Sequence, residues 1–287
     1  MTQKWLIIDG NNLLYSSYHV SQKMAWKITN GTIFFFLRVL ISVLKKGNYQ
    51  KLLVVFDGGG VNFRKNLLPH YKAQREEMPV ELWEQMNELQ ALLKKTNINF
   101  IQLIDCEADD LIASFIQQKT PNADTIFDIF TRDKDLLQLL DKNINILKYI
   151  DGKATLYTCE NFCQEYNFRP NNYVDYLSLL GDNVDNIEGV KGIGPVSAKK
   201  LIQQFQTVEN VYQQIDNLPE NTKKLLTDKE KVVYLNKRII SLEKNIDLSG
   251  EKIPECDFNW EEWKNNPELQ KFCMDNKFRS ILKLLDK

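Results

Sequence analysis

The chain has 287 residues, of which 43% are hydrophobic and 26% charged, as in a globular protein with a sizeable core. The formal net charge is −1, so nucleic-acid binding, if present, must depend on local charge. The five cysteines are scattered without the spacing of a zinc site, and we expect reduced thiols. No apolar run resembles a signal peptide or reaches the ~20 residues of a membrane span. We therefore expect a soluble, cytoplasmic protein.

Strands and helices alternate in the first part of the chain. The apolar patterns predict strands at 5–9, 51–56, 98–104 and 126–131, and helices at 33–45, from 79 onward, at 109–118 and from 136. The residues after Asp9 are expected to form a turn. This alternation predicts an α/β fold, a mostly parallel sheet with helices on both faces.

The alternation of strand and helix patterns ends near residue 170. Downstream, short helices are expected at 173–180, 196–205 and 208–216, followed by a lysine-rich stretch at 223–244. We therefore divide the chain into an α/β part, residues 1–170, and a helical part, residues 171–287.

Acidic residues follow each of the four predicted strands. Because functional groups gather at the carboxyl ends of parallel strands, these acids should meet at one rim of the sheet. Asp182 and Asp185 are three residues apart, which places both on one face of a helical turn. The acids at strand ends are Asp9, Asp57, Glu107, Asp109, Asp110, Asp133 and Asp135.

Gathered carboxylates repel one another, and divalent cations relieve that repulsion. Mg²⁺ prefers carboxylate and water oxygens. Two such ions ~3.5–4 Å apart can catalyse in-line displacement at phosphorus. A single Asp after a strand is more often a helix N-cap or a turn residue. The metal-site interpretation therefore depends on several acids converging.

The motifs that contain these acids resemble the 5′ nuclease domain at the N-terminus of bacterial DNA polymerase I. They include Ile8-Asp9-Gly10-Asn11-Asn12-Leu13-Leu14-Tyr15, Val55-Phe56-Asp57-Gly58, Phe63-Arg64, His70-Tyr71-Lys72-Ala73-Gln74-Arg75, Glu107-Ala108-Asp109-Asp110, Thr131-Arg132-Asp133-Lys134-Asp135, Gly181-Asp182-Asn183-Val184-Asp185-Asn186 and Val190-Lys191-Gly192-Ile193-Gly194. They occur in the family's order along nearly the whole chain. The chain thus resembles a free-standing 5′-3′ exonuclease, similar to phage 5′ nucleases and flap endonucleases.

The resemblance implies a PIN-like nuclease fold with a helical arch, a helix-hairpin-helix (helix-3-turn-helix) motif and two Mg²⁺ ions, for which Mn²⁺ could substitute. Asp9, Asp57, Glu107 and Asp109 match the ligands of the first ion, with Asp110 beside them. The ligands matched to the second ion, which shares Asp109, are Asp133, Asp135, Asp182 and Asp185.

The resemblance also implies DNA contacts. Lys72 and Arg75 match a catalytic basic pair at the base of the arch that contacts the scissile phosphate. Arg64 is matched as a further DNA contact, and Tyr71 as an aromatic that stacks on a terminal base. The helix-hairpin-helix loop, with a K⁺ ion, would hold duplex DNA through Lys191, Gly192, Gly194, Lys199 and Lys200.

One position departs from the family pattern. Ser16 stands where the family usually has an arginine, which puts one phosphate contact in doubt. Lys23 or Lys27 is a candidate substitute for that contact.

We expect a monomeric enzyme that hydrolyses DNA at 5′ ends and 5′ flaps in replication and repair. Its expected substrates are flaps, nicked or gapped duplexes and RNA-primed DNA, as in the removal of primers from Okazaki fragments. The rival interpretation is a binding module that recognises DNA structure without cutting, but such a relative should have lost some of the acids. A ribonuclease of the related toxin fold would lack the glycine-containing helical hairpin after Asp185.

Overall fold

A computed structural model describes residues 2–24, 28–119, 124–150, 153–251, 253 and 257–286. Its centre is a six-stranded sheet with the order β3-β2-β1-β4-β5-β6. Strands β1 to β5 run parallel, and β6 is antiparallel at one edge. The strands are β1 Gln3–Asp9, β2 Lys51–Asp57, β3 Phe100–Leu103, β4 Thr125–Phe130, β5 Ile144–Ile150 and β6 Lys153–Tyr157. The mostly parallel sheet predicted from the sequence is confirmed.

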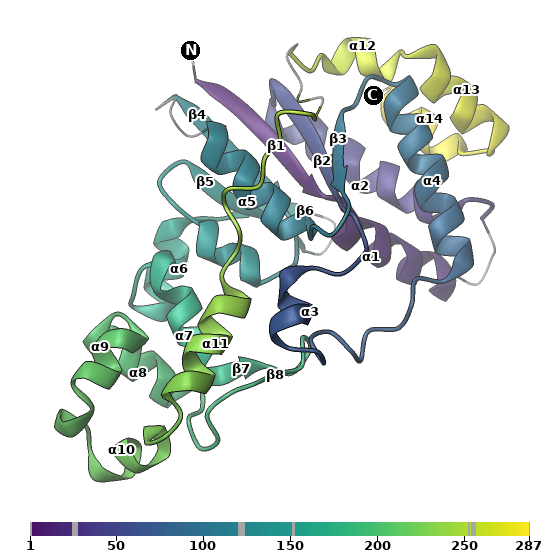
Figure 1. The fold of residues 1–287 in the computed structure, drawn as a ribbon. Coiled ribbons are helices and arrows are strands. Elements are labelled where there is room, and N and C mark those ends of the chain that lie inside the picture. Colours follow the sequence, from purple (N-terminus) through teal and green to yellow (C-terminus); the bar gives the residue numbers. More distant parts are fainter. Residues whose placement is uncertain are drawn as a thin grey trace.

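Alternate residues of each central strand enter separate cores. On β1, Leu6 and Ile8 face one core, whereas Trp5 and Ile7 face the other. Both faces of the sheet are therefore covered (Figure 1). The core that contains Leu6 and Ile8 is covered by α1 Gly10–Lys23, α2 Gly31–Gly47, α4 Val80–Lys95, α12 Trp260–Lys264, α13 Pro267–Asp275 and α14 Arg279–Leu285. The core that contains Trp5 and Ile7 is covered by α5 Ala108–Lys119 and the 3₁₀ helix η1 Asp135–Leu139.

The residues after β1 form a helix, α1 Gly10–Lys23, where a turn was expected. Asp9 caps this helix, because its side chain accepts a hydrogen bond from the backbone N–H of Asn12. The strand-ending acid thereby leads directly into a helix. Glycine and asparagine at the start of α1 made the segment resemble a turn in the sequence.

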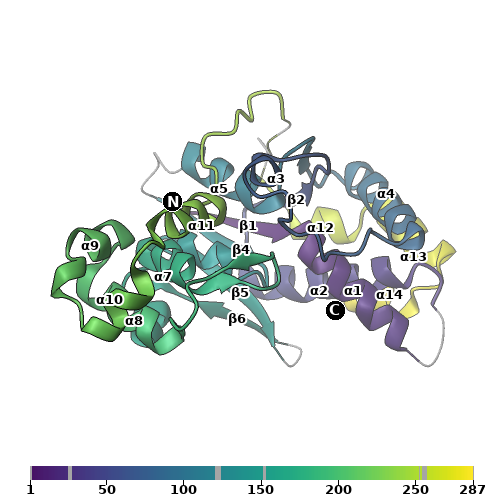
Figure 2. The ribbon, with the colours of Figure 1, turned by 60° about the horizontal axis from the view of Figure 1, so that its bottom comes forward.

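The helical part extends from one end of the sheet (Figure 2). Its helices are α6 Cys159–Tyr166, α7 Tyr173–Leu180, α8 Pro195–Phe205, α9 Val208–Gln213, α10 Glu220–Leu226 and α11 Glu230–Ile240. The C-terminal helices α12 to α14 do not lie with them but beside α2 and α4, far from α8 to α10 (Figure 1). The division near residue 170 stays a prediction.

The segment that carries Asp182 and Asp185 differs from its expected form. Asp182 and Asp185 lie in a hairpin, β7 Gly181–Asp182 and β8 Ile187–Glu188, and not on a helical turn. A Cβ atom on Gly189 would lie 1.9 Å from the Leu180 carbonyl oxygen, so the backbone can turn here only with glycine. Lys72 and Arg75, expected at the base of a helical arch, lie in a turn through residues 69–75, between the five-residue helix α3 Phe63–Leu67 and helix α4.

No helix within the described ranges combines the length and apolar character needed to cross a membrane.

Candidate active site

A cavity of about 440 Å³ opens at the carboxyl ends of the central strands. Five of the predicted acids line it, together with Lys72 and Arg75. These acids are Asp9, Asp57, Glu107, Asp109 and Asp133. The cavity therefore gathers residues that are up to 124 positions apart in the sequence, from Asp9 to Asp133, as the strand-end argument predicted.

Hydrogen bonds fix the two acids that end β1 and β2. Asp9 also accepts a hydrogen bond from the Thr131 hydroxyl at 2.7 Å, which ties β1 to the end of β4. Asp57 accepts one from the backbone N–H of Ala108 at 2.7 Å, and its own N–H donates to the Asn11 side chain. The Asp57 carboxylate is thereby held against the start of α5, and the Asp9 carboxylate is held between the start of α1 and the end of β4.

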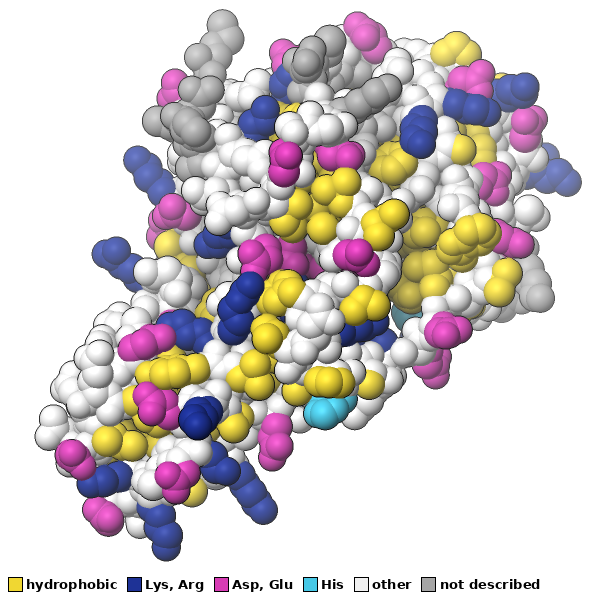
Figure 3. Space-filling view, viewed as in Figure 1, with side chains coloured by type: hydrophobic (Ala, Val, Ile, Leu, Met, Phe, Trp, Pro, Cys, Tyr) yellow, Lys and Arg dark blue, Asp and Glu magenta, His cyan; other side chains and the backbone are white. Residues whose placement is uncertain are grey.

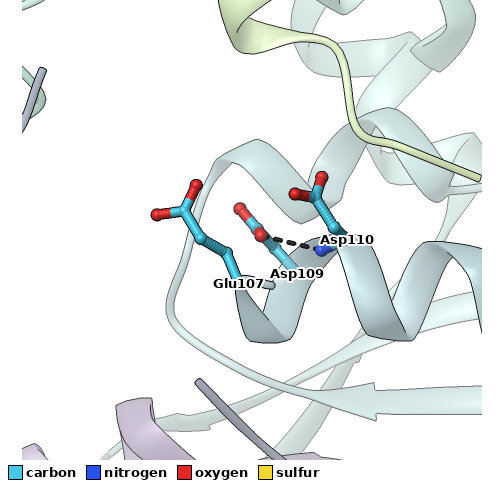
Figure 4. A group of neighbouring side chains, drawn as sticks. All are labelled: Glu107, Asp109 and Asp110. Carbon is cyan, nitrogen blue, oxygen red and sulfur yellow. Dashed lines mark hydrogen bonds between the residues drawn. The ribbon is translucent and has the colours of Figure 1, made fainter. Parts of the chain in front are cut away.

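One group of acids projects from the start of α5, as Figure 4 shows. Each of Glu107, Asp109 and Asp110 offers an oxygen, and the three oxygens lie within 4.8 Å of one another. Asp110 differs from the other two, because both of its oxygens accept hydrogen bonds from the Arg64 guanidinium, at 2.5 and 2.7 Å. Asp110 is thus held in an ion pair beside the cavity.

A second group joins η1 to the β7–β8 hairpin. Oxygens of Asp135, Asp182 and Asp185 also lie within 4.8 Å of one another. Asp182 forms an ion pair with Lys134, at 2.9 Å. One oxygen of Asp135 is buried without a hydrogen-bond partner among the described residues. The hairpin thus brings the acids together although the predicted helical turn is wrong.

Burial raises the pKa of one acid of the cavity, Asp9, and of one acid of the second group, Asp135. The pKa of Asp9 rises to about 7, because the side chain is buried and because Asp57 and Asp133 are close. Burial followed by repulsion from Asp133 and Asp185 raises the pKa of Asp135 to about 7 as well. A nearby positive charge would stabilise the charged form of these buried carboxyl groups and lower their pKa values.

Within the first group, burial also raises the pKa of Asp109, and repulsion from Asp110 and Glu107 adds to the effect. Glu107 behaves differently. Burial alone would raise its pKa, but the charges of Lys72 and Arg64 outweigh burial and lower it. Glu107 is therefore already paired with protein cations.

Lys72 and Arg75 lie between the two groups of acids. The Lys72 ammonium donates a hydrogen bond to Glu107 and lies 3.9 Å from Asp185. Arg75 donates to Asp185 at 2.8 Å, with half of its side chain exposed. Figure 3 shows acidic and basic side chains side by side near the middle of one face of the molecule.

Arg64 and Tyr71, which the resemblance matched to DNA contacts, are buried in this structure. Arg64 is 1% exposed and Tyr71 is 4% exposed, so neither offers a surface to DNA in this structure. Arg64 also donates to the carbonyl oxygens of Ile239 and Ser241, while the Tyr71 hydroxyl donates to Glu107. Both side chains instead pack beneath the cavity and support its acids.

The predicted helix-hairpin-helix loop is exposed. Gly194 is the N-cap residue of α8 and has no capping side chain, and Pro195 follows at the first helical position. The backbone of Gly192 has a φ of 91°, which favours glycine. Lys191 and Lys200 are exposed. Lys199 is half-buried and donates to the Glu165 carbonyl oxygen at 2.5 Å.

Helix α1 lines the cavity, and two of its lining residues, Tyr15 and His19, had been given no individual role from the sequence. Tyr15 and His19 are on this face, together with Ser16 and Lys23. Lys23 is therefore near the position of the missing arginine, while Lys27 lies outside the described residues. The missed residues become evident only once residues 10–23 are recognised as a helix, because a spacing of three or four then places them on one face.

A parallel sheet with converging acids at its carboxyl edge, basic residues over them and a helical module beside it defines a nuclease-like class of protein. Family comparisons agree. Residues 4–167 match the model "5'-3' exonuclease, N-terminal resolvase-like domain". Residues 168–266 match "5'-3' exonuclease, C-terminal SAM fold".

Individual relatives give the same result. A 5'-3' exonuclease of Mycoplasmopsis pulmonis is 35% identical over 255 residues, which cover 88% of this chain and 84% of that protein. DNA polymerase I of Caldicellulosiruptor bescii is 33% identical over 290 residues, and the match covers 98% of this chain but 33% of the polymerase. A bacteriophage T5 flap endonuclease, solved with DNA and metal ions, shares the fold with a TM-score of 0.67 at 20% identity, over 99% of this chain and 100% of that one. The chain belongs to the 5′-3′ exonuclease family.

Proposed function

We propose that this protein hydrolyses phosphodiester bonds of DNA at 5′ ends and 5′ flaps, with two Mg²⁺ ions or, as substitutes, Mn²⁺. The observation that carries the proposal is the convergence of acids from separate segments on one cavity beside Lys72 and Arg75. The phage flap endonuclease of the same fold was solved with DNA and metal ions, which supports the choice of substrate.

The first ion would be held by acids at the ends of β1 and β2 and at the start of α5. Burial raises the pKa of Asp9, Asp57 and Asp109, because it disfavours their charged forms. A divalent cation bound between them would stabilise the charged carboxylates. These carboxylates are the hard oxygen donors that Mg²⁺ prefers. We assign Asp9, Asp57, Glu107 and Asp109 to this ion. Asp110 stays with Arg64, which occupies both of its oxygens.

The second ion would be held by Asp133, Asp135, Asp182 and Asp185. The buried oxygen of Asp135 that has no partner in the described structure fits a ligand to a cation. When bound, the two cations would supply positive charge that activates water and stabilises charge developing on the phosphate.

Lys72 and Arg75 supply the remaining positive charge. In this structure they neutralise Glu107 and Asp185. We propose that they turn to the scissile phosphate when DNA enters the cavity. A cation held there stabilises the negative charge that grows in the transition state. Tyr15, which lines the same cavity, offers an aromatic face for a base in addition to Tyr71, which is buried in this structure.

The loop before α8 would hold the duplex. The uncapped N-terminus of α8 presents backbone N–H groups suited to a phosphate, and Lys191 and Lys200 add positive charge. Figure 3 shows several basic side chains projecting from the part of the molecule that holds α8 to α10. We propose backbone contacts at Gly192 and Gly194 and a K⁺ ion at this loop. Lys199 can contact the DNA only if its hydrogen bond to the Glu165 carbonyl oxygen breaks.

One chain supplies every acid of the proposed site, so we propose a monomer. Its substrates would be 5′ flaps, nicked or gapped duplexes and RNA-primed DNA, which places it in replication and repair.

The test is incubation of a 5′-labelled flap duplex with the protein. We expect cleavage near the junction with Mg²⁺ and none with EDTA. Binding of the flap without cleavage in Mg²⁺ and in Mn²⁺ would instead favour a module that recognises DNA structure.

A further inference from the structure

The turn that carries Lys72 and Arg75 is fastened to the tip of the β7–β8 hairpin. The backbone N–H of Lys72 donates to the Asp185 carbonyl oxygen at 3.0 Å. The Asn186 side-chain amide donates to the His70 carbonyl oxygen at 3.0 Å, and its oxygen accepts from the Gln74 side chain at 3.3 Å. These three contacts join segments that are more than 110 residues apart in the sequence.

The contacts of the hairpin tip are of two kinds. The Asp185 carboxylate interacts with Arg75 and Lys72, and the same carboxylate belongs to the second group of acids. A metal ion bound there would compete with both cations for its oxygens. The contacts of Asn186 and of the Asp185 carbonyl involve no acid side chain. They can therefore persist when the cations leave the carboxylates.

The backbone at Asn186 is built for this role. Asn186 has a φ of 59°, a left-handed conformation that asparagine adopts more readily than most residues. Its amide provides both a donor and an acceptor, and here the two are used on opposite ends of one turn, at His70 and Gln74. Lys72, in the middle of that turn, also has a positive φ, 54°. Such a turn needs outside support to keep its shape.

We propose that Asn186 is a positioning residue for the reaction. It holds the 70–75 turn over the cavity, so that Lys72 and Arg75 can move from acid to phosphate by side-chain rotation while the backbone stays in place. This inference rests on the proposed function, because it concerns the cations assigned there to the scissile phosphate.

Asn186→Gly is the sharpest variant. Glycine accepts the positive φ without strain, so the hairpin backbone is kept and only the amide is lost. We expect the single-turnover cleavage rate to fall about tenfold, in line with the loss of two hydrogen bonds. Flap affinity in Ca²⁺ and the binding of Mn²⁺ should stay within about twofold of wild type. Asn183→Gly, an exposed position in the same hairpin turn, is the matched control and should cleave like wild type.

A double-mutant cycle distinguishes positioning from general damage. In a Lys72→Ala background, the tenfold effect of Asn186→Gly should shrink, because the cation that the turn positions is already absent. The proposal would be overturned if Asn186→Gly still lowered the cleavage rate about tenfold in the Lys72→Ala background. A wild-type rate for Asn186→Gly alone would also overturn it.

We call the hydrogen bonds from Asn186 to His70 and Gln74 the clamp. Hydrogen exchange of the metal-free protein measures the effect of the clamp on the 70–75 turn without any substrate. The amides of residues 70–75 should exchange about tenfold faster in Asn186→Gly than in Asn183→Gly. Unchanged exchange would overturn the proposed clamp even if the protein cleaves DNA. If wild type cuts no flap but this exchange rises, the function assigned to the cavity fails while the clamp itself is supported.

Discussion

Arg64 should behave as a structural residue and not as a DNA contact. Its guanidinium pairs with Asp110 through two hydrogen bonds, bonds Glu107 at 2.8 Å, and reaches two carbonyl oxygens at the end of α11. Burial alone would lower the pKa of Arg64, but the Asp110 hydrogen bonds and the surrounding acids outweigh it and raise the pKa. Arg64 therefore stays charged at the centre of this network.

Arg64→Ala removes one partner of a buried ion pair and leaves the Asp110 carboxylate with the backbone N–H of Glu243. Breaking a buried pair in this way typically costs about 3–5 kcal/mol of unfolding free energy. Lys65 is next to Arg64 on α3 but is exposed. Lys65→Ala should change the unfolding free energy by no more than about 0.5 kcal/mol.

Urea unfolding followed by circular dichroism measures both variants, with midpoints and slopes compared to wild type. We expect a much lower midpoint for Arg64→Ala and little change for Lys65→Ala. A wild-type midpoint for Arg64→Ala, combined with a loss of flap affinity, would show that Arg64 contacts DNA and does not stabilise the fold.

Three further predictions concern the cavity and the DNA-binding loop. Lys72→Ala should lower single-turnover cleavage ~10²-fold with a much smaller change in flap affinity; equal losses in rate and affinity would show that Lys72 only anchors DNA. The metal-free protein should lose stability as pH rises from about 4 to 7, because Asp9 and Asp135, with pKa values of about 7, keep protons that the unfolded chain has released. Asp9→Asn should therefore raise the melting temperature in EDTA more at pH 8 than at pH 5, and an equal rise at both pH values would contradict this assignment. Gly192→Val would strain a φ of 91° and bring its Cβ to about 3.0 Å from Leu225, so it should weaken binding to unrelated duplexes by similar factors, which fluorescence anisotropy can measure.

The fold was predictable where apolar runs were long or ended abruptly. Four parallel strands and helix α7 follow from such runs, and α7 begins and ends at the predicted residues. Strands β5 and β6 were missed, since β6 is an edge strand with largely exposed side chains and the run of β5 is interrupted by polar residues. The helices α12 to α14 were missed because their apolar faces are short.

The acids of the site were predictable because strand ends meet at one edge of a parallel sheet. What each acid contacts was not predictable. Nothing in the local sequence distinguishes Asp110, paired with Arg64, from Asp109 one residue earlier. The clamp at Asn186 depends on a hairpin and a turn that are distant in the sequence. Neither segment has a periodic pattern of apolar residues from which its structure could have been predicted.

Single-turnover cleavage of a 5′-labelled flap by Asp133→Asn is the decisive measurement for the proposed metal site. Asp133 lines the cavity at the end of β4, whereas Asp141 is an exposed acid outside it and provides a matched control. With Mg²⁺, we predict that wild type and Asp141→Asn cut the flap at similar rates, and that Asp133→Asn binds the flap but leaves it intact. Cleavage by Asp133→Asn at the wild-type rate would show that Asp133 holds no cation needed for hydrolysis.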